Sequence, residues 1–418
     1  MNFTNGSRRA LLGGAALAAA TAAMPERSAR AQGREPDRPK LRLGIITDLS
    51  GPYADLSRPA EACARQALED FGVSARGWDV DVLVADHQHK TDVAAATARR
   101  WFDQDGVDAL VDVSTSATAL AINGMAREKN KVFLATEPGT SELTGTSCSP
   151  NTIHWVWDTA MLARSLGSAL LAQGQDSWFF LGADYAFGHQ MARDTAAVVQ
   201  AKGGRVAGSV FHPFPGTSDF SSFLLRAQSS RAKVLGICNA GADLINTVKQ
   251  AREFGLDRSM KIVGMLTYDT VIHGLGLETA QGMQIAASYY WDLNDRTRAW
   301  QARVHPKTPN LYPNMGTAGI YSAVLHYLKV AADMGVAEAK RDGRATVARM
   351  KAMPTDDDCF GAGTIRDDGR KMHPAYILEA KTPAESRHSW DLLKTVAVVP
   401  PEEAFRPMSE GGCPLVRG

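Results

Sequence analysis

The chain has 418 residues, of which 44% are hydrophobic and 22% charged, with a formal net charge of +1 at pH 7. This is the composition of a globular protein, and the length exceeds what one hydrophobic core usually serves, so we expect two domains. The near-neutral charge excludes the strongly basic surface that nucleic acids or anionic membranes attract, and we expect neither as a partner.

The first 31 residues have the pattern of an export signal. Arg8 and Arg9 precede a short, alanine-rich apolar run, and residues 29–31 form an A-x-A cleavage site. The apolar run is shorter than the ~20 residues that a membrane-spanning helix needs, and no later stretch is long enough either. We therefore expect a twin-arginine signal peptide over residues 1–31, cleaved near Ala31, and a periplasmic protein. The signal peptide carries a net charge of +3 and the whole chain +1, so the chain after cleavage carries −2.

From residue 40 onward, short apolar runs alternate with segments of helical periodicity. The predicted strands are 41–46, 79–85, 109–111, 132–135, 178–181, 205–211, 233–238 and 261–265. The predicted helices are 58–71, 91–104, 116–129, 187–202, 218–229 and 242–254. Near-continuously apolar strands that alternate with helices are typical of parallel sheets covered on both faces. Because this alternation of strands and helices begins again at residue 178, we predict two α/β lobes.

The last third is less regular. Helices are expected near 314–334 and 342–352, and strands at 375–380 and 392–399. These strands are too few for a third domain, so they must complete the two lobes.

The chain must therefore pass between the lobes more than once. We expect crossings near 155–159, 286–292 and 355–361. The N-terminal lobe then comprises 40–157 with 290–357, the C-terminal lobe 158–287 with 358–400, and the tail 401–418.

One strand end carries a run of hydroxyl residues. In parallel α/β sheets, ligands bind where strands end and loops lead into helices. Residues 114–118 (Ser-Thr-Ser-Ala-Thr) occupy such a place. Hydroxyl groups beside the free N–H groups of a helix N-terminus suit a carboxylate. Plain N-capping would account for one or two of these hydroxyls, so capping and anion binding both remain open here.

Other chemistries find less support in the sequence. No G-x-S-x-G nucleophile motif and no G-x-G-x-x-G dinucleotide motif occurs, so we expect no cofactor, and a secreted hydrolase is a weak alternative. His87 and His89 would face one side of a strand, but no acidic or cysteine cluster completes a metal site. Residues 289–291 (Tyr-Tyr-Trp) fit either packing between the lobes or a wall of a ligand cleft.

The five cysteines include one plausible pair. Cys148 and Cys413 lie in loop-like segments flanked by proline and glycine, whereas Cys63 and Cys238 lie in apolar helix or strand patterns. In an exported protein we predict a Cys148–Cys413 disulfide that ties down the C-terminal tail. Cys63 and Cys238 are expected as buried thiols.

Four segments resemble periplasmic solute receptors of the branched-chain amino-acid type, which serve ABC importers. They are Leu43–Tyr53, Ser114–Thr118, Asp184–Gly188 and Val234–Asp243, and their order extends the resemblance over nearly the whole chain after the signal. The resemblance implies a type I periplasmic binding protein, an α/β fold of two Rossmann-like lobes with parallel sheets joined by three hinge crossovers. It also implies a permease and ATPase complex as partners.

The resemblance further implies where the ligand binds. Residues 114–118 would hold the carboxylate of a small-molecule ligand, the first loop would frame it, and Phe187 matches a position that is often aromatic. The implied ligand-binding residues are Ser50, Tyr53, Ser114, Thr115, Ser116, Thr136, Tyr185, Phe187, Asn239, Asp243, Leu266, Thr267 and Tyr290.

The sequence departs from the amino-acid receptors at one place. They usually place an acidic residue opposite the carboxylate site, and the matching residues 265–267 (Met-Leu-Thr) include none. A buried ammonium without a counter-charge is costly. We therefore expect an aromatic acid of the benzoate or phenylpropenoid type. The rings expected to wall it are Tyr53, Tyr185, Phe187, Tyr268 and Tyr290. If Asp243 points into the cleft, an amino acid becomes the expected ligand.

The sequence thus predicts a non-enzymatic receptor that captures a small carboxylate by lobe closure and delivers it to a membrane permease. A receptor for a branched-chain or other amino acid is the main alternative. A sensor that presents its ligand to a membrane receptor, and a secreted hydrolase, are the others.

Overall fold

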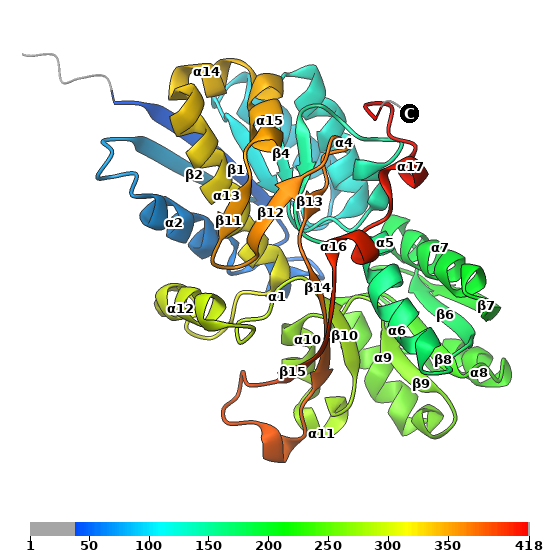
Figure 1. Ribbon diagram of the computed structural model, residues 1–418. Coiled ribbons are helices and arrows are strands. Elements are labelled where there is room, and N and C mark those ends of the chain that lie inside the picture. The colour runs from blue at the N-terminus through cyan, green and yellow to red at the C-terminus, as the bar shows by residue number, and fades with distance from the viewer. Residues whose placement is uncertain (1–37, 417–418) are drawn as a thin grey trace, which may run out of the picture. The chain divides into compact units, whose positions relative to one another are not determined.

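The computed structural model describes residues 38–416, so the predicted signal peptide lies outside the described residues. The first sheet is entirely parallel, with the strand order β2-β1-β3-β4-β5 (Figure 1). Its strands are β1 (Lys40–Thr47), β2 (Asp79–Asp86), β3 (Ala109–Asp112), β4 (Val132–Ala135) and β5 (Thr152–His154).

Helices cover both faces of this sheet. One hydrophobic cluster lies under α3 (Thr91–Asp103) and α4 (Ser116–Glu128). The opposite face is covered by α2 (Ala60–Phe71) and by α13 (Met315–Met334), which returns from late in the chain and packs on α2. The lobe also contains α1 (Ala54–Ser57), the 3-10 turn η1 (Ser141–Thr144), α14 (Val336–Arg341) and α15 (Gly343–Ala352).

The second sheet is also parallel, with the order β7-β6-β8-β9. Its strands are β6 (Ser177–Ala183), β7 (Arg205–His212), β8 (Val234–Cys238) and β9 (Lys261–Gly264). Its helical segments are α5 (Thr159–Leu162), the π-helix η2 (Ala163–Gly167), α6 (Ser168–Ala172), α7 (Ala186–Ala201), α8 (Ser221–Ser229), α9 (Gly241–Glu253), η3 (Leu256–Arg258), α10 (Asp269–Leu275) and α11 (Leu277–Ala280).

Two small antiparallel sheets complete the chain. Strands β10 (Gln284–Ala287), β14 (Ala375–Ala380) and β15 (Leu393–Val399) form one, and β11 (Thr355–Asp357), β12 (Gly361–Ile365) and β13 (Lys371–Met372) form the other. Along the chain, α12 (Asp295–Val304) and η4 (His305–Lys307) follow β10, and η5 (Pro383–Glu385) lies between β14 and β15. The expected crossing at 355–361 is wrong, because those residues pair within one hairpin packed on α13 and α15. The chain leaves the first lobe only after β13 (Figure 1).

The predicted elements occur, each within three residues of its expected ends. The α/β class and the two parallel sheets are therefore confirmed. The expected helix from residue 58 begins at Ala60, after Pro59, which has no N–H to donate to a preceding turn. The sequence missed short strands such as β5 and β13, of three and two residues, because they are too short to show a periodicity. It also missed the longer helices α10 and α12, of seven and ten residues.

A buried ion pair holds the first passage between the lobes. A guanidinium nitrogen of Arg370 lies 3.0 Å from a carboxylate oxygen of Asp158, whose other oxygen caps α5 by accepting from the Met161 N–H. Both side chains are buried. Burial, the largest single effect, would raise the pKa of Asp158, but Arg370, His154 and the Met161 N–H together hold that pKa below its usual range. Such a pair adds little net stability but fixes orientation.

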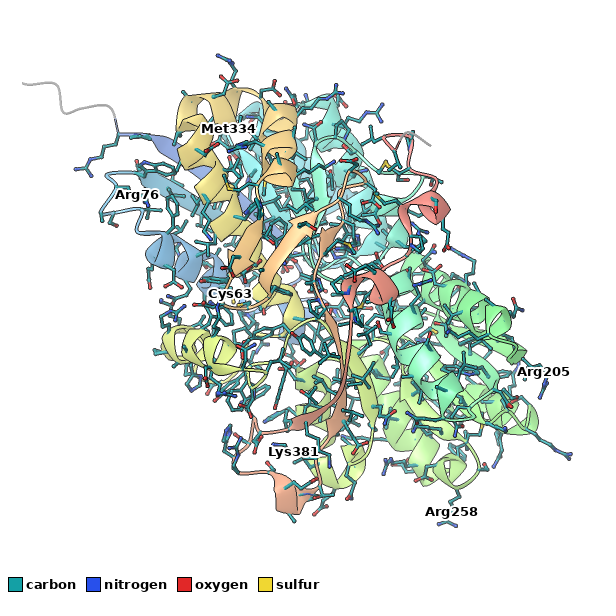
Figure 2. All side chains as sticks on the ribbon, viewed as in Figure 1. Cys63, Arg76, Arg205, Arg258, Met334 and Lys381 are labelled. Carbon is teal, nitrogen blue, oxygen red and sulfur yellow. A yellow bond between two sulfur atoms is a disulfide. The ribbon has the colours of Figure 1, made fainter. Side chains whose placement is uncertain are left out.

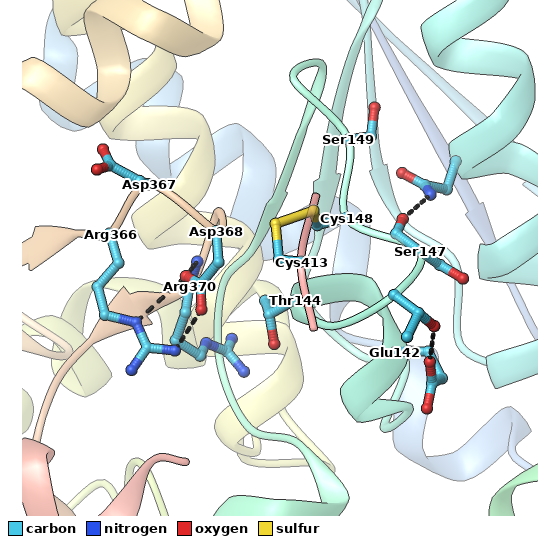
Figure 3. Close-up of a disulfide and its surroundings, with 12 residues drawn as sticks. Glu142, Thr144, Ser147, Cys148, Ser149, Arg366, Asp367, Asp368, Arg370 and Cys413 are labelled. Atoms are coloured by element: carbon cyan, nitrogen blue, oxygen red, sulfur yellow. Dashed lines mark hydrogen bonds and ion pairs between the residues drawn. A yellow bond between two sulfur atoms is a disulfide. The ribbon is translucent and has the colours of Figure 1, made fainter. Parts of the chain in front are cut away.

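The C-terminal tail returns from β15 to the first lobe. Helix α16 (Pro401–Ala404) packs on η2, and after α17 (Met408–Gly411) the tail reaches the loop between η1 and β5. There Cys413 and Cys148 form a disulfide with their Cα atoms 5.6 Å apart (Figure 3). The predicted pairing is confirmed. The remaining cysteines, Cys63, Cys238 and Cys359, are buried free thiols.

Exposed positive charge is spread over the molecule. Arg76 projects from the first lobe, and Arg205 and Arg258 project from the second (Figure 2). Within residues 38–416, no helix combines the length and the apolar character needed to cross a membrane.

Beside the buried ion pair lies a buried lysine, Lys371 of β13. Its ammonium nitrogen has no hydrogen-bond partner among the described residues and lies 4.7 Å from the centroid of the Phe360 ring. Burial lowers the pKa of Lys371 to about 8, although the Asp357 carboxylate favours its charged form. The ordinary pKa of a lysine is ~10.4, so between pH 8 and ~10.4 the unfolded chain holds a proton on Lys371 that the folded chain has lost. The free energy of unfolding of the wild type should therefore rise with pH over this range.

We predict that Lys371→Met raises the free energy of unfolding at pH 7 by about 1–3 kcal/mol, because a charge no longer has to be buried. The advantage over the wild type should shrink as the pH rises from about 8 towards ~10, where the wild-type lysine loses its proton in both states. Urea unfolding at several pH values measures this. Lys202→Met, at an exposed position, is the control, and a destabilised Lys371→Met protein would contradict the prediction.

Candidate ligand pocket

The carboxyl ends of the two parallel sheets meet at a nearly closed pocket with a cavity volume of about 20 Å³. Its walls come from loops at the carboxyl ends of β3, β4, β6, β8 and β9 and from the loop after β1, as expected for parallel strands. The lining residues are Tyr53, Leu56, Ser114, Thr115, Ser116, Glu137, Gly139, Trp157, Tyr185, Phe187, Ala240, Leu266 and Tyr268.

One end of the pocket is the N-terminus of α4. Thr115 is the N-cap residue, but its side chain does not cap the helix and donates instead to the Thr118 hydroxyl at 2.7 Å. The Ser116 hydroxyl is buried and has no hydrogen-bond partner among the described residues. The first N–H groups of a helix have no partner within the helix. This end therefore presents hydrogen-bond donors and the positive end of the helix dipole.

The backbone before α4 is strained. Asp112 and Val113 have φ angles of 80° and 68°, in the left-handed region that a β-branched residue such as valine rarely adopts. The strain directs the chain from β3 into the loop whose residues line the pocket, and such strain concentrates at functional sites. Burial raises the pKa of Asp112 to about 7.

Ser114 shares a hydrogen bond with His87 Nε2 at 2.8 Å. A serine nucleophile needs such a histidine, and it also needs a third group that orients the ring. The other ring nitrogen of His87 has no hydrogen-bond partner among residues 38–416, so the orienting group is lacking there. No group of three potential metal ligands occurs in the same part of the chain.

Aromatic rings form the rest of the wall. The hydroxyls of Tyr53, in the first lobe, and Tyr185, in the second, share a hydrogen bond of 2.5 Å across the cleft. Phe214 stacks on Tyr185 with the ring centroids 4.6 Å apart. The Trp157 indole packs edge-on against Phe187, and its N–H is buried without a hydrogen-bond partner in the described part of the chain.

A carboxyl group, that of Glu137, also lines the pocket. It is 6% exposed, and one of its oxygens accepts a hydrogen bond from the Tyr268 hydroxyl of the second lobe. Burial, followed by the nearby Asp112 carboxyl, raises the pKa of Glu137 well above its ordinary value. Glu137 thus provides an acidic group in the pocket, although residues 265–267 contain none.

Seven of the thirteen residues implied by the resemblance line the pocket. They are Tyr53, Ser114, Thr115, Ser116, Tyr185, Phe187 and Leu266. Five lining residues were not among those expected from the sequence: Leu56, Glu137, Gly139, Trp157 and Ala240. Glu137 follows Thr136 at the end of β4, and an acidic residue at a strand end was the available signal.

The other six implied residues do not line the pocket. Ser50 lies at the surface and donates to Asp86, and Thr136 donates to Asp112. Asn239 bonds to His212 and Thr247.

Thr267 donates to the Gly264 carbonyl, and Tyr290 donates to the Trp390 carbonyl, so neighbouring backbone occupies both hydroxyls. Asp243 does not line the pocket either. It lies 3.9 Å from His212, and burial raises its pKa to about 6.

Comparisons with known proteins agree with this geometry. The model of the periplasmic binding protein family matches residues 40–386. A periplasmic binding protein of Burkholderia mallei is 42% identical over 91% of this chain and all of its own, with a TM-score of 0.86. No curated protein matches the chain.

Two further solved structures are similar. A branched-chain amino acid ABC transporter periplasmic ligand-binding protein of Burkholderia xenovorans is 39% identical over 90% of this chain and 99% of its own (TM-score 0.80). A Rhodopseudomonas palustris solute-binding protein in complex with benzoate is 18% identical over 87% of this chain and 97% of its own (TM-score 0.76), which shows the fold alone.

Gly139 determines where the Trp157 ring lies, since a Cβ at residue 139 would come within 2.4 Å of that ring. We predict that Gly139→Ala displaces the indole and destabilises the protein by about 1–3 kcal/mol. Thermal unfolding and tryptophan fluorescence measure both effects. Gly124→Ala is the matched control: it lies in α4 with open space around it, so it should stabilise by about 0.5–1 kcal/mol. Equal effects of the two substitutions would contradict this assignment.

Proposed function

The chain belongs to the periplasmic binding protein family of ABC-transporter solute receptors, and on this premise we propose that it captures a small aromatic carboxylic acid. The acid binds in the pocket between the lobes and passes to a membrane permease driven by its ATPase. The lobes close over the ligand by a hinge motion at the connecting segments. Members of this family are transport receptors rather than enzymes.

The observation that carries the proposal is the donor-rich end of the pocket. The Ser116 hydroxyl, at the uncapped start of α4, and the Trp157 indole N–H both belong to residues that line the pocket, and both are buried without a hydrogen-bond partner among the described residues. A buried polar group without a partner costs about 1–3 kcal/mol. A carboxylate supplies acceptor oxygens for such donors, and its charge is favoured at a helix N-terminus.

The wall composition supports an aromatic ligand. Five of the thirteen lining residues are aromatic, namely Tyr53, Trp157, Tyr185, Phe187 and Tyr268. Aromatic rings pack favourably against one another in offset or edge-to-face arrangements.

An amino acid is the second candidate. The relative of 39% identity is described as a branched-chain amino acid binding component, and Glu137 places a carboxyl group in the pocket that an ammonium could meet. Asp243 is not among the residues that line the pocket, but its carboxyl group acts on the Tyr53 and Tyr185 hydroxyls and, after burial as the main cause, raises their pKa.

A thermal-shift screen tests the proposal. Protein stripped of ligand by unfolding and refolding is mixed with benzoates, phenylpropenoids, aromatic amino acids and aliphatic amino acids. A bound ligand stabilises the folded state by about 2.7 kcal/mol at 100 times its Kd. We expect the melting temperature to rise with aromatic acids and not with matched neutral amides. A rise with aliphatic amino acids alone would favour the second candidate.

We predict that Ser116→Ala weakens binding of the acid found in that screen by about 10- to 100-fold, because one hydrogen bond to a charged group is worth about 1.5–3 kcal/mol. Titration calorimetry measures the affinity, and circular dichroism checks the fold. Ser147→Ala is the control, because Ser147 does not line the pocket and its backbone carbonyl, not its side chain, accepts the hydrogen bond from Asn123. An unchanged affinity of the Ser116→Ala protein would show that this hydroxyl does not bind the ligand.

A further inference from the structure

The C-terminal tail runs from the second lobe to the first and is held by both. At its start, α16 packs on η2 of the second lobe, where the Arg164 side chain donates to the Glu403 carbonyl at 3.1 Å. Further along, the Arg406 carbonyl accepts a hydrogen bond of 2.8 Å from Arg366, in the hairpin of the first lobe. The tail therefore crosses from one lobe to the other between residues 403 and 406.

The crossing point lies against the segments that join the lobes. Phe405 is 1% exposed, and the Arg370 guanidinium lies 4.9 Å from the centroid of its ring. The His373 ring packs edge-on against Phe405 with the centroids 5.1 Å apart. Arg370 pairs with Asp158 at the first passage, and His373 follows β13, where the chain leaves the first lobe. The tail thus forms a further connection beside these passages.

A disulfide makes this connection covalent. Cys413 is bonded to Cys148, in the loop between η1 and β5 of the first lobe (Figure 3). The two backbones lie in close contact nearby, because a Cβ at Gly145 would come within 2.9 Å of the Gly411 carbonyl oxygen, and one at Gly411 within 3.0 Å of the Thr144 carbonyl oxygen. The tail is thus docked on one lobe at its start and bonded to the other at its end, so rotation of the lobes must stretch it or undock it.

The tail also holds a loop that leads to the pocket. Arg406 donates to the Ser141 carbonyl at 3.1 Å, and the Ser141 hydroxyl donates to Asp194 of α7 at 3.1 Å. Gly139, two residues before Ser141, lines the pocket, and so does Phe187 in the first turn of α7. The tail is therefore connected to the pocket walls of both lobes.

We propose that the disulfide-closed tail, residues 400–413, is a strap that limits how far the two lobes open. A cross-link removes freedom mainly from the state that has most of it, as a disulfide does when it constrains an unfolded chain. The freer state here is the open one, so the strap shifts the equilibrium towards the closed form. The strap acts on the protein without ligand, so the inference does not depend on the ligand proposed above.

Double electron–electron resonance on protein stripped of ligand tests the strap. Spin labels on Arg76→Cys and Arg258→Cys report the separation of the lobes, because both side chains are exposed and project from different lobes (Figure 2). The native free thiols are buried. The Cys148→Ser/Cys413→Ser variant cuts the strap, and we expect its fraction of molecules at the longer, open distance to rise by about 3- to 10-fold.

A second variant slackens the strap and keeps the disulfide. An insertion of about six Gly and Ser residues between Pro407 and Met408 adds up to ~20 Å of chain, so it should open the lobes as the double serine variant does. The same insertion between Lys202 and Gly203, in an exposed turn within the second lobe, is the control and should leave the distance unchanged.

The two variants together separate a strap from a local staple. If neither variant lengthens the distance, or if only the loss of the disulfide does so, the disulfide merely secures the tail on the first lobe and the inference is overturned. If the double serine variant does not fold, the slackened variant decides alone, and an unchanged distance in it overturns the inference. Each of these outcomes leaves the proposed function as it stands.

Discussion

The pocket depends on one constraint: the edges at which the strands of the two parallel sheets end face each other. In a parallel sheet every strand ends at the same edge and every following helix begins there, so loops, helix N-termini and free N–H groups gather at one place. Ser116 after β3, Glu137 after β4 and Leu266 after β9 are far apart in sequence yet line one cavity. An antiparallel arrangement would have sent alternate loops to the opposite edge.

This arrangement holds only if the segments between the lobes are fixed. Arg370 and Asp158 are buried together at such a passage, and Asp158 also caps the first helix of the second lobe. Breaking a buried pair by removing one partner is strongly destabilising, whereas the intact pair contributes direction more than stability. The disulfide between Cys148 and Cys413 adds a covalent link that fastens the returning tail to the first lobe.

Close packing around the pocket relies on small residues beside large or polar ones. Gly139 leaves room for the Trp157 ring, and Gly316 leaves room for the Glu137 carboxyl. In each case an added Cβ would occupy the position of the functional group. Ser116 at the start of α4 and Glu137 after β4 line the same pocket, together with five aromatic side chains.

The sequence by itself determined the alternating strands and helices of the two lobes, the two parallel sheets, the hydroxyl loop at the start of α4 and the Cys148–Cys413 pair. These follow from local periodicity, turn composition and capping, which neighbouring residues control. Tertiary structure alone decided which strand-end side chains enter the pocket. Thr136 and Glu137 are adjacent, but Thr136 bonds to Asp112 while Glu137 reaches Tyr268 and the niche at Gly316. Tyr268 and Gly316 lie more than a hundred residues from Glu137, so no local pattern could record these two partners.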